Sequence, residues 1–257
     1  MTWEAKTEER NICVVIPTYN NAGTLADVLR RTLKYMKHVI VVNDGSTDST
    51  SQILEDEEFK DIEIVSYEKN QGKGHALKQG FKRAKQLGYS MAVTLDSDGQ
   101  HYPEDIHVLV EALPNDYDAF VVGIRNFNNE NMPNQNLFAN RFSNFWFRLQ
   151  TGVNLPDTQC GFRLYPLKKI RMWWPITSRY ESELEFLVFS SWSGTQIIPV
   201  EVNVYYPPKE ERISHFKPFY DFFRISVLNT ILTILSIVFV PARFFRWILK
   251  KIRHHNK

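Results

Sequence analysis

Val93–Asp105 reads VTLDSDGQHYPED and joins an apolar run to a pair of carboxylates. The run Met91–Leu95 ends abruptly at Asp96-Ser97-Asp98. Continuous apolar runs are typical of buried parallel strands, and open α/β sheets bind ligands outside the carboxyl ends of such strands. Two carboxylates at that position predict a Mg²⁺ or Mn²⁺ site that water and phosphate oxygens complete. The alternative is a solvated turn whose Asp residues cap a helix that begins near Pro103.

Apolar runs alternate with segments of helical spacing through the first half of the chain. This alternation predicts an α/β fold with a mostly parallel central sheet and helices on both faces. Farther along, Asn126–Asn136 is an Asn-rich loop and Leu137–Leu149 has helical spacing. The segments expected to be extended are Ile12–Ile16, His38–Val42, Ile62–Tyr67, Met91–Leu95, Ala119–Gly123, Asp157–Tyr165 and Ile197–Tyr206.

Composition restricts the class of protein. The 257 residues carry a net charge of +2, but residues 243–257 hold six Lys or Arg and no acid, which leaves about −4 for the rest. The body is therefore not a general polyanion binder, and no nucleic acid is expected as a partner. The two cysteines are Cys13, inside an apolar run, and Cys160, so a reducing compartment is expected. The first ten residues contain no apolar stretch of the kind found in signal peptides.

Ile225–Ala242 contains no charged residue and precedes the basic tail. As a helix it would span ~27 Å, just short of the hydrocarbon core of a bilayer. A buried core helix is one interpretation. The flanking Arg and aromatic residues favour a membrane-associated segment. A single crossing would place the basic tail on the far side, against the positive-inside bias, so we expect a monotopic arrangement at the cytoplasmic face, with both ends cytosolic.

Four strand-end loops are expected to meet at one crevice: Pro17–Asn21, Asn43–Asp48, Asn70–Gly74 and Asp96–Asp98. In this crevice Asp44 can accept hydrogen bonds from a base or a ribose hydroxyl. Lys73 stands between two glycines, which lets a point charge approach a phosphate closely. The chain lacks the G-x-G-x-x-G motif of dinucleotide-binding enzymes and the G-x-x-x-x-G-K-[ST] motif of P-loop NTPases.

Several stretches closely resemble the family 2 inverting glycosyltransferases, which have the GT-A fold. They are VVIPTYNNAGTL, VIVVNDGSTDST, NQGKGHALKQGF and TLDSDGQHYPEDI, in the family's order and spacing over roughly the first 125 residues. Farther along, VVGIRN, ANRFSN and DTQCGFRLYP are similar to the polyprenyl-phosphate branch, typified by dolichyl-phosphate mannose synthase. The resemblance implies a single Rossmann-like catalytic domain over residues 1–221. Its nucleotide-sugar half covers about 10–125, its acceptor half about 126–221, and residues 222–257 form a membrane-associated tail.

The resemblance also implies a nucleotide-diphosphate sugar as donor and a divalent cation as cofactor, bound by Asp96 and Asp98. It places Thr18, Tyr19 and Asp44 at the nucleoside and Gln100 near the sugar. The family usually has an acidic residue where this chain has Asn21. The donor-binding residues expected are Pro17, Thr18, Tyr19, Asp44, Lys73, Asp96, Ser97, Asp98, Gln100 and His215, and the catalytic residues are Asp157, Arg125, Arg141 and Arg163. His215 lies in Arg212–Phe216, which can close over the diphosphate, and the three arginines would face phosphate.

The acceptor decides whether a base is needed. A lipid phosphate is already anionic, whereas a hydroxyl needs a carboxylate within hydrogen-bond reach. Asp157 and Glu183 are the candidate bases, and the alternative for Asp157 is an Asx turn after Pro156. Glu183 is interpreted instead as a solvated or salt-bridged residue beside Arg179. The function expected is transfer of a sugar to a lipid-linked acceptor, preferably polyprenyl phosphate. Transfer to a hydroxyl of a lipid or glycan, a catalytically inactive nucleotide-sugar-binding module, and a homo-oligomeric state are left open.

Overall fold

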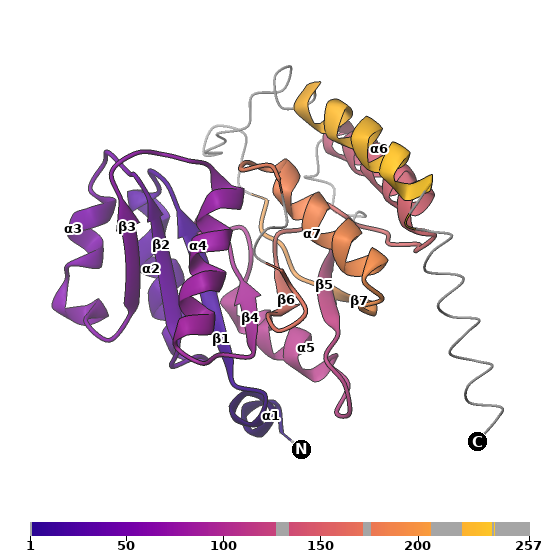
Figure 1. The fold of residues 1–257 in the computed structure, drawn as a ribbon. Helices are drawn as coiled ribbons and strands as arrows, with labels where there is room; N and C mark the ends of the chain where they lie inside the picture. Colours follow the sequence, from indigo (N-terminus) through magenta and orange to yellow (C-terminus); the bar gives the residue numbers. More distant parts are fainter. Residues whose placement is uncertain (1, 127–133, 172–175, 207–222, 238, 240–257) are drawn as a thin grey trace.

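The computed structural model describes residues 2–126, 134–171, 176–206, 223–237 and 239 (Figure 1). Within these residues the strands form one sheet of seven in the order β3-β2-β1-β4-β6-β5-β7. Only β6 is antiparallel to its neighbours, so the predicted mostly parallel sheet is confirmed. The strands are β1 Ile12–Thr18, β2 Val39–Asp44, β3 Glu63–Tyr67, β4 Met91–Thr94, β5 Phe120–Arg125, β6 Arg163–Pro166 and β7 Ile197–Val202.

The described helices lie on both faces of this sheet. A short 3₁₀ turn follows α3 (η1, Glu57–Phe59), and another precedes α5 (η2, Pro103–Asp105). A further helix covers residues 223–237. The remaining helices are α1 Trp3–Glu9, α2 Ala22–Leu33, α3 Thr50–Leu54, α4 Lys73–Gln86, α5 Ile106–Glu111, α6 Asn134–Thr151 and α7 Glu181–Trp192.

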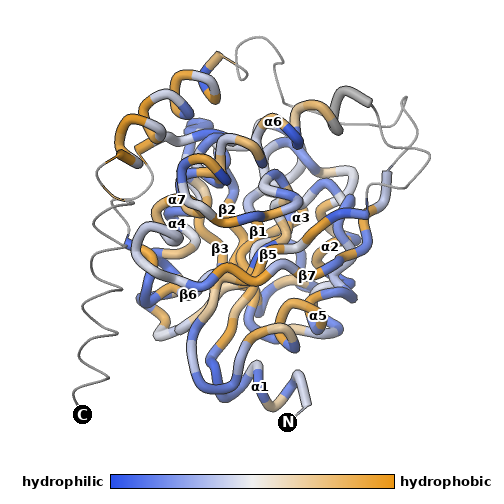
Figure 2. Tube along the Cα trace, turned by 90° about the vertical axis from the view of Figure 1, so that its right-hand side faces the viewer, coloured by the Kyte–Doolittle hydropathy of each residue, from blue (hydrophilic) through white to orange (hydrophobic). Residues whose placement is uncertain are grey.

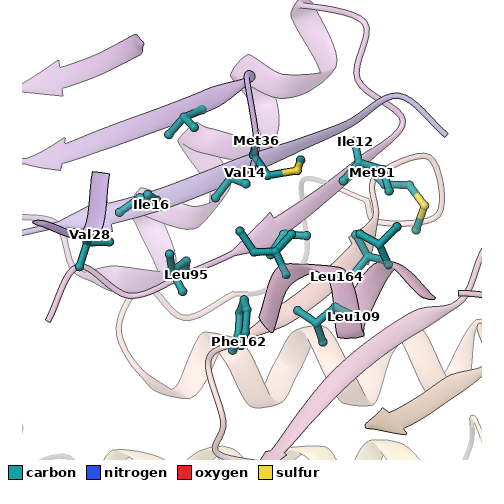
Figure 3. Close-up of a cluster of buried hydrophobic side chains, with 14 of the residues drawn as sticks. Ile12, Val14, Ile16, Val28, Met36, Met91, Leu95, Leu109, Phe162 and Leu164 are labelled. Atoms are coloured by element: carbon teal, nitrogen blue, oxygen red, sulfur yellow. The ribbon is translucent and has the colours of Figure 1, made fainter. Parts of the chain in front are cut away.

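The alternation of side chains along β1 shows how the sheet divides the core. Ile12, Val14 and Ile16 point to one face, where they join α2 and α5 in the buried cluster of Figure 3. Cys13 and Val15 point to the other face, toward α4, α6 and α7. Successive side chains of a strand point to opposite sides, so a strand buried on both faces is apolar throughout. Figure 2 shows these hydrophobic strands inside a more hydrophilic surface.

Part of the segment expected to form the tail packs onto the rest of the structure. Helix 223–237 (yellow in Figure 1) lies beside α6. Gln150 of α6 donates to the Asn229 carbonyl at 3.2 Å and to the Thr233 hydroxyl at 3.3 Å. Leu228 and Leu232 are buried in the same cluster as α7. Among the described residues, no helix has the length and apolar content needed to cross a bilayer.

Candidate active site

The strand-end loops meet as the sequence predicts. The side-chain amide of Asn21 donates to the Ser97 hydroxyl at 2.8 Å. This hydroxyl in turn donates to the backbone carbonyl of Pro17 at 3.2 Å. The Asn20 amide N–H donates to the Ser46 hydroxyl at 3.0 Å. The loops after β1, β2 and β4 are therefore joined directly. Asn21, which replaces the family's usual acidic residue, has a structural role in this network.

Asp44 connects the loop after β2 to the loop after β3. It is only 2% exposed, and its carboxylate accepts from the Gln71 and Gly72 amides at 2.8 Å and from the Asn70 side chain at 3.0 Å. The nucleoside contact expected of Asp44 thus stays a prediction, and its observed role is to fix the loop that carries Lys73. Close by, the buried Thr18 hydroxyl has no hydrogen-bond partner among the described residues, and Tyr19 is half-buried.

Lys73, at the first position of α4, is shared by two carboxylates. Its ammonium lies 2.8 Å from Asp96 Oδ1, 2.9 Å from Asp96 Oδ2 and 3.0 Å from Glu183 Oε2. Burial opposes the charge on Lys73, yet Asp96 and Glu183 raise its pKa above the ordinary value. Burial also acts to raise the pKa of Asp96, but Lys73 reverses this effect and lowers it. The sequence predicts that Glu183 is either solvated or salt-bridged beside Arg179. The structure shows that Glu183 is salt-bridged and that its partner is Lys73.

Asp98 has a different environment from Asp96. Its Oδ1 accepts the Gln100 amide N–H at 3.0 Å. Burial and the nearby negative charge of Asp96 raise the pKa of Asp98 to about 6. The helical segment that begins at Pro103 has Tyr102 as its N-cap and no side-chain cap hydrogen bond, so the two Asp residues do not serve as its caps.

Asp96 and Asp98 supply two of the oxygen ligands that a divalent cation requires. Two carboxylates one residue apart in the loop after β4 form an anionic oxygen site of the kind that Mg²⁺ or Mn²⁺ occupies together with phosphate oxygens and water. No group of three or more His, Cys, Asp or Glu side chains is placed to hold a metal within the described parts of the chain. The donor set of the protein here is thus the Asp pair.

Arg125 and Asp157 form an anchored ion pair between the end of β5 and the loop before β6. The Arg125 guanidinium donates from Nε to Asp157 Oδ2 at 2.7 Å and from Nη2 to Oδ1 at 3.0 Å. The backbone amides of Arg125, Gln159 and Cys160 also donate to Asp157, whose side chain is fully buried. Both oxygens of Asp157 are thus occupied by N–H donors. This geometry is that of an anchor for Arg125 and for the loop before β6, and the contact of the Gln159 amide with Asp157 is the Asx turn given as the alternative. The role of Asp157 as a base stays a prediction.

The three arginines expected at phosphate have different environments. Arg163 is fully buried and donates to the carbonyls of Cys160 at 2.6 Å, Glu183 at 2.8 Å and Thr158 at 2.9 Å. These contacts connect the loop before β6 to α7, so Arg163 fixes the position of this loop relative to Glu183. Arg141 is exposed on α6. His215 lies outside the described residues.

His101 is a residue of the site that sequence reasoning missed. It is 6% exposed, its Nε2 lies 3.6 Å from Cys160 Sγ, and its Nδ1 has no partner among the described residues. Burial lowers its pKa to about 4, so the ring is neutral near pH 7. His101 also pairs with Val204 in an isolated antiparallel bridge. Its position directly after Gln100 in a strand-end loop was the signal that could have identified it.

A pocket of about 650 Å³ opens beside the bridge between His101 and Val204. Asn126, next to Arg125 in the chain, belongs to its wall. The loop that holds Gln100 lies nearby, because the Gln100 carbonyl accepts the Tyr205 amide at 2.8 Å. The other residues that line the pocket are Tyr102, Glu104, Asp105, Val202, Asn203, Val204 and Tyr206.

A carboxylate pair beside a half-buried lysine lies at the carboxyl edge of this mostly parallel sheet, which is where open α/β sheets bind their ligands. The family model for glycosyl transferase family 2 matches residues 13–172, and the chain belongs to that family.

Proteins with assigned activities share this family. The chain is 29% identical to a UDP-N-acetylglucosamine–dolichyl-phosphate N-acetylglucosaminyltransferase of Methanococcus voltae, over 77% of this chain and 87% of the relative. It is 30% identical to a polyprenol monophosphomannose synthase of Mycolicibacterium smegmatis, over 59% of this chain and 60% of the relative. The fold is similar to glucosyl-3-phosphoglycerate synthase of Mycobacterium tuberculosis, solved with Mn²⁺, UDP and phosphoglyceric acid. The TM-score is 0.65 at 18% identity, over 94% of this chain and 81% of that structure.

Proposed function

We propose that this chain transfers a sugar from a nucleotide-diphosphate sugar to polyprenyl phosphate, with inversion at the anomeric carbon. The observation that carries the proposal is the carboxylate pair Asp96 and Asp98 within a family 2 domain, with Asp96 salt-bridged to Lys73. The names of the relatives from Methanococcus voltae and Mycolicibacterium smegmatis support the acceptor class, since both specify a polyprenol-type lipid.

In the proposed reaction an oxygen of the lipid phosphate attacks the anomeric carbon, the bond from that carbon to the diphosphate oxygen breaks, and a nucleoside diphosphate leaves. Asp96 and Asp98 would hold Mg²⁺ or Mn²⁺, which neutralises negative charge on the leaving diphosphate. Because a phosphate oxygen is already anionic, the reaction requires no general base. This agrees with Asp157, whose oxygens are both engaged by N–H donors.

The acceptor class can be tested with the full chain in detergent. UDP-N-acetylglucosamine, UDP-glucose and GDP-mannose are supplied in turn with Mn²⁺, and the acceptors are undecaprenyl phosphate and the matching undecaprenol. We expect transfer from one donor to the phosphate only, and loss of transfer with EDTA. Transfer to undecaprenol would favour the hydroxyl-acceptor alternative. Donor binding without transfer or hydrolysis would favour the inactive binding module.

We also propose that the chain works at the cytoplasmic face of a membrane and binds it through the 222–257 segment. Helix 223–237 supports this because one side of it is exposed and apolar. The exposed side chains follow helical spacing, and Ile234 and Ile237 are 62% and 71% exposed. On α6, Phe145 is 61% exposed and neighbours the exposed Arg148, a pairing that suits the headgroup region of an anionic bilayer. Residues 240–257, which carry the basic tail, lie outside the described residues.

Flotation with vesicles of phosphatidylglycerol and phosphatidylcholine tests this arrangement without requiring turnover. We expect the wild-type chain to float with the vesicles, and the double variant Ile234→Ser/Ile237→Ser to remain largely at the bottom. The matched control is Leu87→Ser, which changes an apolar side chain that is 42% exposed at the end of α4. Equal flotation of wild type and the double variant would refute the role of this helix face.

A further inference from the structure

We propose that Glu183 is a positioning residue of the donor site, which shares the Lys73 ammonium with Asp96 and thereby sets the charge next to the cation-binding carboxylates. This inference rests on the proposed function, because it concerns the same site. It adds a residue from α7, in the second half of the domain, to a site formed otherwise by loops of the first half.

The geometry is that of a closed three-residue cluster. Lys73 comes from α4, Asp96 from the loop after β4 and Glu183 from α7. The ammonium contacts lie between 2.8 and 3.0 Å, and the side chains of Lys73, Asp96 and Glu183 are 17%, 23% and 9% exposed. Three separate elements therefore converge on one nitrogen in a largely desolvated place.

Gly161, in the loop before β6, closes the cluster from one side. A Cβ built on Gly161 would lie 2.9 Å from both Asp96 Oδ2 and the Lys73 nitrogen, and 3.2 Å from Glu183 Oε1. The Thr94 hydroxyl donates to the Gly161 carbonyl at 2.7 Å and fixes this approach. The cluster is thus packed tightly against backbone, so its members have little room to move apart.

The charges of the cluster do not balance. Lys73 and the buried Arg163, which donates to the Glu183 carbonyl at 2.8 Å, supply two positive charges. Asp96, Glu183 and Asp98 supply three negative charges, which leaves a net charge of −1. Glu183 Oε1 is buried and has no hydrogen-bond partner among the described residues. Excess buried negative charge is costly unless a cation or further donors complement it. The surplus that Glu183 supplies therefore favours a divalent cation at Asp96 and Asp98.

This arrangement makes opposite predictions for the two partners of the ion pair. Replacing Glu183 by Gln removes one negative charge and should weaken cation binding. Replacing Lys73 by Gln removes one positive charge and should strengthen it. A residue that served only to pack the fold would not give opposite signs.

The experiment measures Mn²⁺ binding to the full chain by electron paramagnetic resonance, with circular dichroism to show that each variant is folded. We expect the Kd for Mn²⁺ to rise about tenfold for Glu183→Gln and to fall by a similar factor for Lys73→Gln. The control is Glu181→Gln. This residue lies two positions before Glu183 on α7, its side chain is 1% exposed, and it pairs with Arg224 outside the cluster. Its substitution should leave the Kd unchanged.

The outcomes separate this inference from the proposed function. If the wild-type chain binds Mn²⁺ and Glu183→Gln binds it equally well, or if Glu183→Gln and Lys73→Gln shift the Kd in the same direction, the inference is overturned and the proposed function stands. If the wild-type chain binds no Mn²⁺, both the metal assignment and the inference are overturned.

Discussion

Asp157→Asn separates an anchoring role of this residue from a role as general base. Asp157 Oδ1 accepts from Arg125 Nη2 and from the amides of Gln159 and Cys160, and Oδ2 accepts from Arg125 Nε and the Arg125 amide. In either orientation, the NH₂ of an Asn side chain would face at least two N–H donors. The substitution would therefore break the ion pair and oppose donor to donor.

The expected cost follows from burial. Breaking a buried ion pair by removing one partner costs about 3–5 kcal/mol. The Arg125 side chain retains 16% exposure and can reach water, so the lower end, about 3 kcal/mol, applies. For a domain of this size, each kcal/mol lowers Tm by about 2–4 °C. We therefore expect Tm to fall by about 6–12 °C.

Thermal unfolding followed by circular dichroism measures this change, and transfer to undecaprenyl phosphate is assayed below the lowered Tm. The matched control is Glu58→Gln, which breaks an ion pair of the same two-pronged geometry with Arg30 at the exposed surface. Its effect on Tm should be far smaller because water screens exposed pairs. An unchanged Tm with abolished transfer for Asp157→Asn would refute the anchor and restore the general base.

Asp98→Asn should keep the wild-type Tm and lower Mn²⁺-dependent turnover by about two orders of magnitude or more; a near wild-type rate at saturating donor and Mn²⁺ would remove Asp98 from the metal site. Because burial and Asp96 raise the pKa of Asp98 to about 6, the carboxylate takes up a proton as the pH falls through that value. The Mn²⁺ affinity of the wild-type chain should therefore decrease from pH 7 to pH 5, and a titration that is flat over this range would contradict the assignment. Gly161→Ala would place a Cβ 2.9 Å from the Lys73 nitrogen and should cost about 1–3 kcal/mol of stability, measured as a lowered Tm. Gly23→Ala, with no atom within 4 Å of the added Cβ, serves as its control and should not lower Tm.

The strands and the strand-end loops could be predicted because their signal is local. A strand buried on both faces must be apolar at every position, so β1, β2 and β4 stand out in the sequence. The end of such a run also marks where the loop begins, which located Asp44 and Asp96-Ser97-Asp98. The parallel sheet then follows from the alternation of strands and helices, and the convergence of the loops follows from the parallel sheet.

The sequence carries no comparable signal for helix α7, because this helix is buried on every side. Every residue from Glu181 to Trp192 is buried. A helix that is enclosed on all sides carries no apolar stripe, so spacing gives no sign of it. Its three glutamates also resemble a solvated surface, although each is buried and paired: Glu181 with Arg224, Glu183 with Lys73 and Glu185 with Thr177.

The sequence by itself determined the sheet, the crevice at its carboxyl edge and the Asp pair within it, because each depends on local periodicity or on a motif within a few residues. Only the tertiary structure decided the partners of the charges: Lys73 with Asp96 and Glu183, Arg125 with Asp157, and Arg163 with three backbone carbonyls. The pairings of Lys73 and Arg125, and the contact of Arg163 with Glu183, join residues that are at least 20 positions apart in the chain. A charged side chain looks the same in sequence whether it faces water, a phosphate or a buried carboxylate, and the packing of β6 and α7 against the first half of the sheet selects among these environments.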